Sequence, residues 1–310
     1  MLKIRIFPPH TGKTEYYTIK NRGAELIKIG IVILNYLAYQ TTIDTVSSFD
    51  LQDKEGFEVF YVIVDNCSPN ESYEKLKKAY RGRKDIAVVR TGNNLGFANG
   101  NNFGYKQLLL HMKPDFTIIS NDDILLPQQG LYKWIVQCSR EYKFAVLGPD
   151  VYSVSGKFHQ SPLENHSRDI HECRKEYNEL RKKYIKCLVK KFLKISGYQG
   201  TPVWKNDAYD KFTGSMTLHG SFQVFSNIYF RKYSQPYDTT TFLYMEEDIL
   251  KLRCDRHNLK MIYSPDYQVH HLQAIATNMI NKTNYDKELF RRKHLIHSFR
   301  SYMALLKKLG

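Results

Sequence analysis

Four mostly apolar runs follow one another in the first half of the chain. They are IKIGIVILNY (27–36), FEVFYVIVDN (57–66), IAVVRT (86–91) and FTIISNDD (116–123). Strands that are apolar on both faces are typical of parallel sheets, because helices cover both sides of such a sheet. The pattern therefore predicts four buried strands.

The segments between these runs carry residues at helical spacing. Two sets show it: Tyr73, Leu76, Lys77 and Tyr80, and then Phe103, Gln107 and Leu110. Strands that alternate with helices in this way predict an α/β fold with a doubly wound, mostly parallel sheet.

The alternation of strand and helix patterns becomes less regular after Pro149. A polar and basic stretch (156–208) follows, and GSMTLHGSFQVFS (214–226) then resumes a packed pattern. We interpret 156–208 as an insertion or a mobile arm.

Acidic residues mark three places along the chain. Asp65 follows the run VFYVIV, the triplet Asn121-Asp122-Asp123 follows FTIIS, and a third cluster is Glu246-Glu247-Asp248. A carboxylate is costly inside a core unless it is paired or bound to a metal. Acids just past the ends of apolar strands therefore predict a ligand site at the rim of the sheet.

The segment TGNNLGFANGNNFGY (91–105) is rich in glycine and asparagine. It suits tight turns and predicts a helix that opens at about Asn101 or Asn102. Taken alone, the segment is better explained as a capped loop. The familiar phosphate loops, Gly-x-x-x-x-Gly-Lys-Ser/Thr and Gly-x-Gly-x-x-Gly, do not occur in the sequence.

Composition narrows the class of protein. The 310 residues suffice for one large α/β domain or two closely packed lobes. Five scattered cysteines without a Cys-x-x-Cys pair argue against a disulfide scaffold and against structural zinc. No apolar stretch has the length of a membrane span, and the start lacks the apolar core of a secretory signal, so we expect a cytoplasmic protein.

The charge is strongly positive, with 46 Lys and Arg against 31 Asp and Glu. Residues 181–194 (RKKYIKCLVKKFLK) contain seven basic residues and no acid, with Ile185, Leu188, Val189 and Phe192 at helical spacing. A second basic region runs from FRRKH to the terminal LLKKLG. This pattern predicts helices that lie on an anionic membrane surface at the inner face of the plasma membrane. A solvated basic face on a core helix is the alternative.

Several motifs together resemble the family 2 glycosyltransferases, in particular the bacterial branch that includes rhamnosyltransferases of cell-surface polysaccharides. The resemblance covers about residues 27–277. It rests on motifs in the order of the family: IVILNY, VDNCSPNES, NNLGFANGNNFG, SNDDI, LHGSFQVFS, TFLYMEEDILKLR and YSPDYQVHH. It implies a GT-A fold, a nucleotide-diphospho-sugar donor, Mn²⁺ or Mg²⁺ as cofactor, and transfer with inversion.

The same resemblance divides the chain. An N-terminal extension (1–26) precedes a nucleotide-sugar-binding half (27–123). An acceptor-binding half (124–277) contains the basic insertion (156–208), and a basic helical tail (278–310) ends the chain.

On the nucleotide side, the resemblance implies that Asp65 hydrogen-bonds the base and that Asn35 lies in the ligand-facing turn of the first strand. A carboxylate can accept from a ring N–H, which gives base selectivity. The alternative is that Asp65 only begins a turn in DNCSPN. Four further residues are implied as nucleotide-binding: Asn94, Gly96, Asn121 and Asp122.

Asn121-Asp122-Asp123 matches the Asp-x-Asp element of the family, with Asn in place of the first Asp. The resemblance implies that Asp123 coordinates the metal, which prefers oxygen ligands. The alternative is a strand that ends in a polar turn. One of His270 and His271 is implied to contact the metal or the diphosphate, and counting from Pro265 favours His271; at most one should face the site, because neighbours on an extended segment point oppositely.

On the acceptor side, the resemblance implies Glu247 as the general base, although the family has Asp at this position. Asp248 is the second candidate, and Glu246 precedes both. An acidic helix start is the structural alternative. His219 and Gly220 resemble the acceptor-side wall. Trp134 and Trp204 are core or acceptor-platform residues, with the core favoured for Trp134.

We therefore predict an inverting, metal-dependent glycosyltransferase. Its acceptor would be a glycan of a bacterial capsule, O-antigen or cell-wall polysaccharide, linked to undecaprenyl diphosphate if it is carried on a lipid. A sugar nucleotidyltransferase would need a basic Gly-rich loop after the first strand, where this chain has NYLAYQTT. A nucleic-acid-binding module would explain the charge but not the placed acids, so we expect no nucleic-acid partner.

Overall fold

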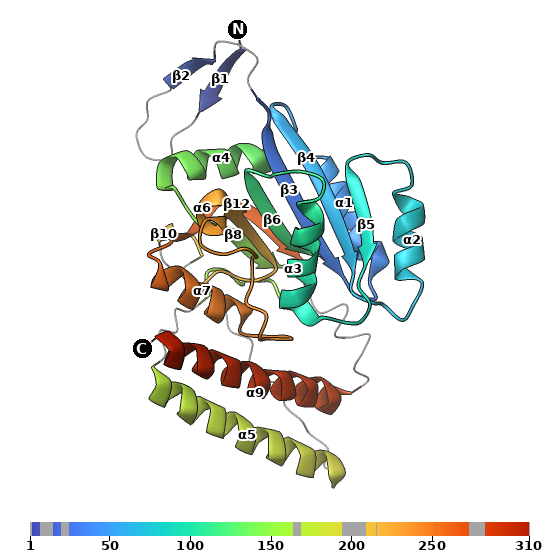
Figure 1. The fold of residues 1–310 in the computed structure, drawn as a ribbon, viewed down its shortest axis with the longest axis vertical. Helices are drawn as coiled ribbons and strands as arrows, with labels where there is room; N and C mark the ends of the chain where they lie inside the picture. Colours follow the sequence, from blue (N-terminus) through green and yellow to red (C-terminus); the bar gives the residue numbers. More distant parts are fainter. Residues whose placement is uncertain are drawn as a thin grey trace.

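The computed structural model describes residues 2–6, 15–19, 25–163, 169–193, 209–214, 216–272 and 283–309. Near the amino terminus, β1 (Leu2–Ile6) and β2 (Glu15–Ile19) form an antiparallel hairpin. The remaining strands form one sheet of ten strands, which Figure 1 shows with helices on both faces.

The four predicted strands are confirmed and form the parallel half of the sheet. They are β3 (Ile27–Asn35), β4 (Phe57–Asp65), β5 (Ile86–Arg90) and β6 (Phe116–Asn121), in the order β6-β3-β4-β5. Helices α1 (Tyr39–Asp50), α2 (Ser72–Ala79) and α3 (Gly96–Leu108) connect or follow them.

Both faces of this half are buried, as the apolar runs predict. Ile31 and Ile63 belong to one core cluster, whereas Val32 and Val62 belong to a second, and all four are fully buried. Because neighbouring residues of a strand point to opposite faces, the two clusters lie on the two sides of the sheet.

Helix α3 begins at Gly96 and not at Asn101 or Asn102, so the prediction for its start was wrong. The glycines of this segment allow the helix to pack closely. An added Cβ at Gly100 would lie 2.7 Å from Leu34, and one at Gly104 would lie 2.4 Å from Val32. Glycine lowers helix propensity, so the sequence resembles a loop although packing stabilises a helix there.

The second half of the chain extends the sheet. Its strands are β7 (Ile124–Leu125), β8 (Val146–Ser153), β9 (Phe158–His159), β10 (Thr213–Gly214), β11 (Phe222–Ser226) and β12 (Met261–His271). Its shorter helices are α4 (Leu131–Tyr142), α6 (Asn227–Phe230) and α7 (Glu246–Arg256). Strand β11 runs antiparallel between β6 and β8, and β12 runs parallel to β8.

The predicted basic insertion (156–208) is helical only in part. Its first described residues belong to the sheet, because β9 pairs with β8. Helix α5 (Ile170–Phe192) then begins with a capping box between Asp169 and Glu172. A second long helix, α9 (Asn284–Leu309), lies beside it, and Figure 1 shows α9 between α5 and α7. No helix in the described ranges combines the length and apolar character needed to cross a membrane.

Candidate active site

The polar residues predicted at the strand ends meet at the carboxyl edge of the parallel half. Asn35 ends β3 directly beside Asp65 at the end of β4, and its neighbour Leu34 pairs with Asn121 of β6. The Asn35 amide donates a hydrogen bond to Asp65 Oδ2 at 2.8 Å, and Thr42 donates to Asn35 Oδ1 at 3.0 Å. This edge is where ligands bind in open α/β sheets.

Asp65 is fully buried, and both of its oxygens have partners. The backbone N–H of Ser68 donates to Oδ1 at 3.0 Å, and Arg90 Nε lies 3.5 Å from the same oxygen. The turn that the sequence offers as an alternative is therefore present. A contact of Asp65 with a nucleotide base stays a prediction, and Arg90 is a neighbour that the sequence gave no reason to single out.

Asn94 and Gly96 shape the turn that leads into α3. Asn94 Oδ1 accepts from Asn66 at 3.1 Å and from the backbone N–H of Gly96 at 2.9 Å. Gly96 has φ +75°, and an added Cβ would lie 2.1 Å from the carbonyl oxygen of Phe242. Glycine is required there by backbone geometry and by close approach, and the nucleotide contacts of both residues stay predictions.

Asp122 and Asp123 follow the end of β6. The backbone N–H of Tyr36 donates to Asp122 at 3.4 Å. Burial raises the pKa of Asp122 well above its ordinary value, and the neighbouring charge of Asp123 adds to the effect. Asp123 is buried, and β7 directly after it pairs with the end of β12.

This pairing brings His271 to Asp123. His271 Nε2 lies 3.2 Å from Asp123 Oδ1, whereas His270 points elsewhere and contacts Gln268 at 3.2 Å. The structure therefore places His271, and not His270, beside the acid. His271 Nδ1 lies 2.9 Å from Gln160 Oε1. Because that oxygen only accepts, Nδ1 carries a proton, and Nε2 is the ring atom that faces Asp123.

A carboxylate oxygen and an imidazole nitrogen that face each other are ligands that suit a cation. Asp123 Oδ1 is buried and accepts no hydrogen bond among the described residues. A divalent ion between it and His271 Nε2 would satisfy both atoms. Within the described ranges, no three His, Cys, Asp or Glu side chains converge as a ready-made metal site. The remaining ligands would therefore come from a bound diphosphate and water.

A pocket of about 410 Å³ collects the predicted acceptor-side residues. The pocket is lined by Phe97, Asn121, His219, Gly220, Ser221, Leu243, Tyr244, Met245, Glu246, Glu247, Asp248, Arg291, Leu295 and Phe299. Glu247 Oε1 accepts from the backbone N–H of Gly220 at 3.2 Å, and an added Cβ at Gly220 would lie 2.6 Å from that oxygen. Glycine thus lets the carboxylate approach the backbone.

Burial raises the pKa values of two acids of this pocket above their ordinary range. Burial raises the pKa of Glu247 to about 7, with a contribution from the charge of Asp248. Burial also raises the pKa of Glu246 to about 8, with a contribution from Glu247. A carboxyl whose pKa lies near neutrality is suited to take up a proton during a reaction.

Two other features of the pocket bear on its chemistry. Burial, with the nearby His271, lowers the pKa of His219 to about 3, so this imidazole stays neutral and its Nδ1 lies 2.9 Å from Ser221 Oγ. Tyr244 and Met245, immediately before α7, have φ values of +70° and +65°. Such backbone conformations are costly for residues other than glycine and are common next to functional groups.

The sequence missed Gln160 and Arg291 as site residues. Gln160 lies near the end of the described range 25–163, and no motif of the family resemblance includes it. Arg291 stood out only as part of a basic run, yet α9 brings it to the wall of the pocket. Trp134 is buried and donates to Ser264 at 3.2 Å, which confirms the core position; Trp204 lies outside the described residues.

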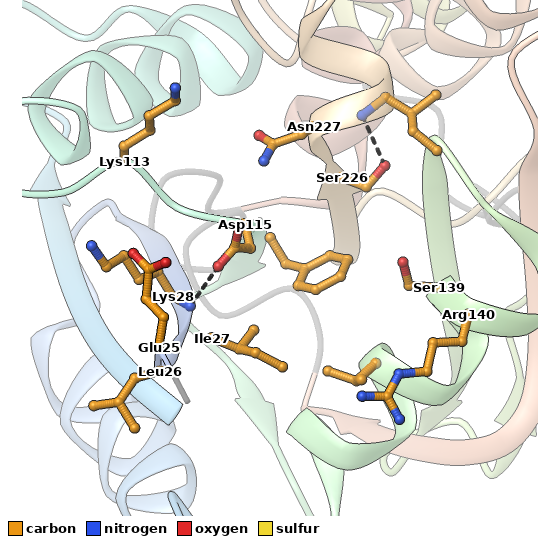
Figure 2. Close-up of a pocket in the computed structure, with 13 residues that line it drawn as sticks. Glu25, Leu26, Ile27, Lys28, Lys113, Asp115, Ser139, Arg140, Ser226 and Asn227 are labelled. Atoms are coloured by element: carbon orange, nitrogen blue, oxygen red, sulfur yellow. Dashed lines mark hydrogen bonds between the residues drawn. The ribbon is translucent and has the colours of Figure 1, made fainter. Parts of the chain in front are cut away.

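A larger cavity, of about 620 Å³, lies at the opposite edge of the sheet (Figure 2). It borders the first residues of β3 and β6. Asp115 there accepts from the backbone N–H of Lys28 at 2.9 Å, and Ser226 accepts from that of Ile228 at 3.2 Å. These polar groups cap strand and helix starts, so the cavity does not contribute to the site above.

Three solved structures with similar folds have low sequence identity to this chain. S. aureus TarS 1-349 matches with a TM-score of 0.51 and 12% identity over 88% of this chain and 65% of that chain. The same protein in complex with UDP-GlcNAc matches at 0.51 and 13%, over 88% and 66%. The mannosyltransferase PcManGT from Pyrobaculum calidifontis, in complex with GDP-Man and Mn²⁺, matches at 0.50 and 13%, over 89% and 69%.

These similarities show a GT-A fold. The chain spans less than two thirds of the length of the TarS chains. A search of curated protein sequences finds no match. The family model described as "Glycosyl transferase family 2" matches residues 30–210, which is more than half of the sequence. The chain therefore belongs to glycosyl transferase family 2.

Proposed function

We propose that the protein is an inverting, metal-dependent glycosyltransferase that moves a sugar from a nucleotide-diphospho-sugar to a hydroxyl of a glycan. The observation that carries this proposal is the carboxylate of Glu247. It has a pKa of about 7 and lines the same pocket as Asn121 and His219. His219 in turn lies beside His271, with ring centroids 5.6 Å apart. A proton acceptor and a candidate diphosphate site are thus neighbours.

Each residue would have a defined part in the reaction. Glu247 takes the proton from the acceptor hydroxyl as its oxygen bonds to the anomeric carbon, while the bond to the nucleoside diphosphate breaks. Asp123 and His271 would hold the divalent ion, which would stabilise the negative charge of the leaving diphosphate. Asn35, Asp65, Asn94 and Gly96 would surround the nucleotide.

Binding measurements identify the donor nucleotide. TarS was solved with UDP-GlcNAc and PcManGT with GDP-Man, which makes UDP and GDP the first nucleotides to test. For the acceptor, we propose a lipid-linked glycan of a bacterial surface polysaccharide, with the enzyme peripheral at the cytosolic membrane face. The rhamnosyltransferase-like motifs support this part of the proposal.

Thermal stability of the purified protein tests the donor site without an acceptor. UDP, dTDP, GDP and CMP are each added with Mn²⁺, Mg²⁺ or EDTA. A ligand that binds only the native state raises the free energy of unfolding by about 2.7 kcal/mol at one hundred times its Kd. We expect one diphosphate to raise the melting temperature, and EDTA to abolish the shift.

The variant Asp123→Asn is the matched control. It should lose the metal-dependent part of the shift and keep the melting temperature of the ligand-free protein. No shift with any nucleotide at millimolar concentration would refute the proposal.

A further inference from the structure

One face of α5 exposes large apolar side chains. Phe192 is 85% exposed, Leu193 59% and Ile185 56%, and Leu188 and Val189 are also exposed. Residues 185, 188, 189 and 192 follow helical spacing, so their side chains form one continuous stripe. We call these five residues the apolar stripe. Single exposed apolar residues are ordinary, but a contiguous group marks an interaction surface.

The stripe is separate from the face by which α5 packs on the protein. Cys173 and Cys187 are buried, and Tyr177 and Leu180 pack into a cluster with α9. The hydroxyl of Tyr177 accepts from Arg300 at 2.8 Å. Because α5 already has a packed face, the stripe is a second apolar surface.

Lysines lie beside the stripe. Residues 181–193 carry six basic residues and no acid, and Lys191 pairs with Asp286 of α9. On a helical projection, Lys182, Lys186 and Lys190 border the stripe on the side away from α9. Two copies of this chain joined through the stripe would bring these lysines close together, and like charges would repel. An anionic surface complements both the stripe and the lysines.

We propose that the apolar stripe inserts into the boundary between headgroups and acyl chains of an anionic phospholipid bilayer, while Lys182, Lys186 and Lys190 contact the headgroups. This arrangement is typical of amphipathic helices that lie in a membrane interface. The inference deepens the proposed function and rests on it in one respect: a lipid-linked acceptor would be a component of the same membrane.

Helix α9 connects this surface to the pocket. It packs on α5, and its Arg291, Leu295 and Phe299 line the pocket beside the Glu246–Asp248 acids. Ser298 of α9 also donates to the carbonyl of Leu243 at 2.8 Å, just before α7. A bilayer bound at α5 therefore lies on the side of the molecule where the acceptor pocket is, as the positions of α5, α9 and α7 in Figure 1 illustrate.

Vesicle flotation tests the surface. The full chain is mixed with vesicles of phosphatidylcholine alone or with phosphatidylglycerol added. We expect binding to the anionic vesicles only, and weaker binding at high salt. The variant Ile185→Ser/Val189→Ser/Phe192→Ser and the variant Lys182→Gln/Lys186→Gln/Lys190→Gln should each reduce the partition coefficient at least about tenfold, because each basic residue and each buried apolar group adds to partitioning.

Two matched controls change the same residue types elsewhere. Leu51→Ser/Leu110→Ser alters two residues that are each 75% exposed, and Lys75→Gln/Lys77→Gln/Lys78→Gln alters α2. Both should bind vesicles like the wild type. Nucleotide-induced stabilisation should be unchanged in all four variants, which separates failure of this inference from failure of the proposed function.

Three outcomes would overturn the inference. One is a wild type that does not bind anionic vesicles. Another is binding that survives both sets of α5 substitutions. The third is a dimer, seen by light scattering, that the serine substitutions in the apolar stripe dissociate, because the occupant of the surface would then be a second copy of the chain.

Discussion

The parallel half of the sheet and the helical cap formed by α5, α7 and α9 are built on different principles. In the parallel half, Asn35, Asp65 and Asn121 each end a strand whose core residues are fully buried. In the cap, the pocket wall combines Glu247 of α7 with Arg291 of α9, which lie far apart in sequence. Residues on the first surface are positioned by strand ends, and residues on the second by packing between helices.

One loop joins the two regions. The carbonyl of Phe242 accepts from the backbone N–H of Phe97 at 2.8 Å, at the start of α3. On its other side, Ser301 of α9 donates to the carbonyl of Thr240 at 2.9 Å. The loop then leads through Tyr244 and Met245 to the acids of α7. Changes on either side of this loop therefore test how far the two regions act together.

Replacing the proposed base should have the largest effect. Glu247→Gln keeps the shape of the side chain but cannot take up the proton, so we expect kcat to fall about 10²- to 10⁴-fold. Donor binding should be unchanged, because Glu247 belongs to the cap. Initial rates of sugar transfer and nucleotide-dependent melting temperatures measure the two effects separately.

Asp248→Asn is the control for this substitution, and we expect it to cost less than tenfold in kcat. If Asp248→Asn were the damaging variant and Glu247→Gln kept full activity, the base would be Asp248.

The pH profile should report the same carboxyl. Because the pKa of Glu247 is raised to about 7, its ionised fraction falls below neutral pH. We expect kcat/KM to decrease about tenfold per pH unit below pH 7 and to level off above it. The residual activity of Glu247→Gln should lack this dependence, and an identical profile in that variant would assign the titration to another group.

Stability provides an independent measurement of this pKa. The folded state raises the pKa of Glu247 from 4.5 to about 7, so folding favours the protonated form. The contribution of this group to the free energy of unfolding is therefore complete below about pH 4.5 and is lost as the pH rises to about 7. The side chain of Glu247→Gln is neutral at every pH. The free energy of unfolding of this variant, minus that of the wild type, should therefore be larger at pH 8 than at pH 5.

Removing the partner that orients His271 should have a smaller effect. Gln160→Leu removes the oxygen that accepts from His271 Nδ1, and loss of such an orienting partner weakens metal affinity about 10- to 100-fold in general. Titration of Mn²⁺ in the nucleotide-stabilisation measurement gives this affinity. Gln160→Glu retains an acceptor oxygen and should keep most of it; equal affinity in the leucine variant would remove Gln160 from the site.

The sequence predicted the residues at strand ends better than the contacts between segments that are distant along the chain. Asp65 and Asn121 are found by counting along apolar runs, because a strand end is a local signal. Gln160 reaches the site because β9 pairs with β8, which in turn lies beside β12, and Arg291 reaches it through packing of α9; no local period records such contacts. Helix α3 was misplaced for a related reason: its glycines oppose a helix locally and are explained only by close packing on β3 and β4.

The smallest effect should come from Gly96, where the two regions meet. Gly96→Ala and Gly56→Ala both place a side chain at positive φ, +75° and +85°. At Gly56 nothing lies within 4 Å of the added Cβ, whereas at Gly96 the Cβ would lie 2.1 Å from the carbonyl oxygen of Phe242. Backbone strain alone costs about 1 kcal/mol for such a change. We expect Gly56→Ala to lower the free energy of unfolding by about that amount, and Gly96→Ala by about 2 to 3 kcal/mol because the backbone of the loop must also move. Chemical denaturation measures both values.

Since the loop continues to Glu247, Gly96→Ala should also lower kcat, and Gly56→Ala should not. Equal destabilisation with unchanged kcat in both variants would mean that the parallel half and the helical cap tolerate displacement of this loop independently of each other.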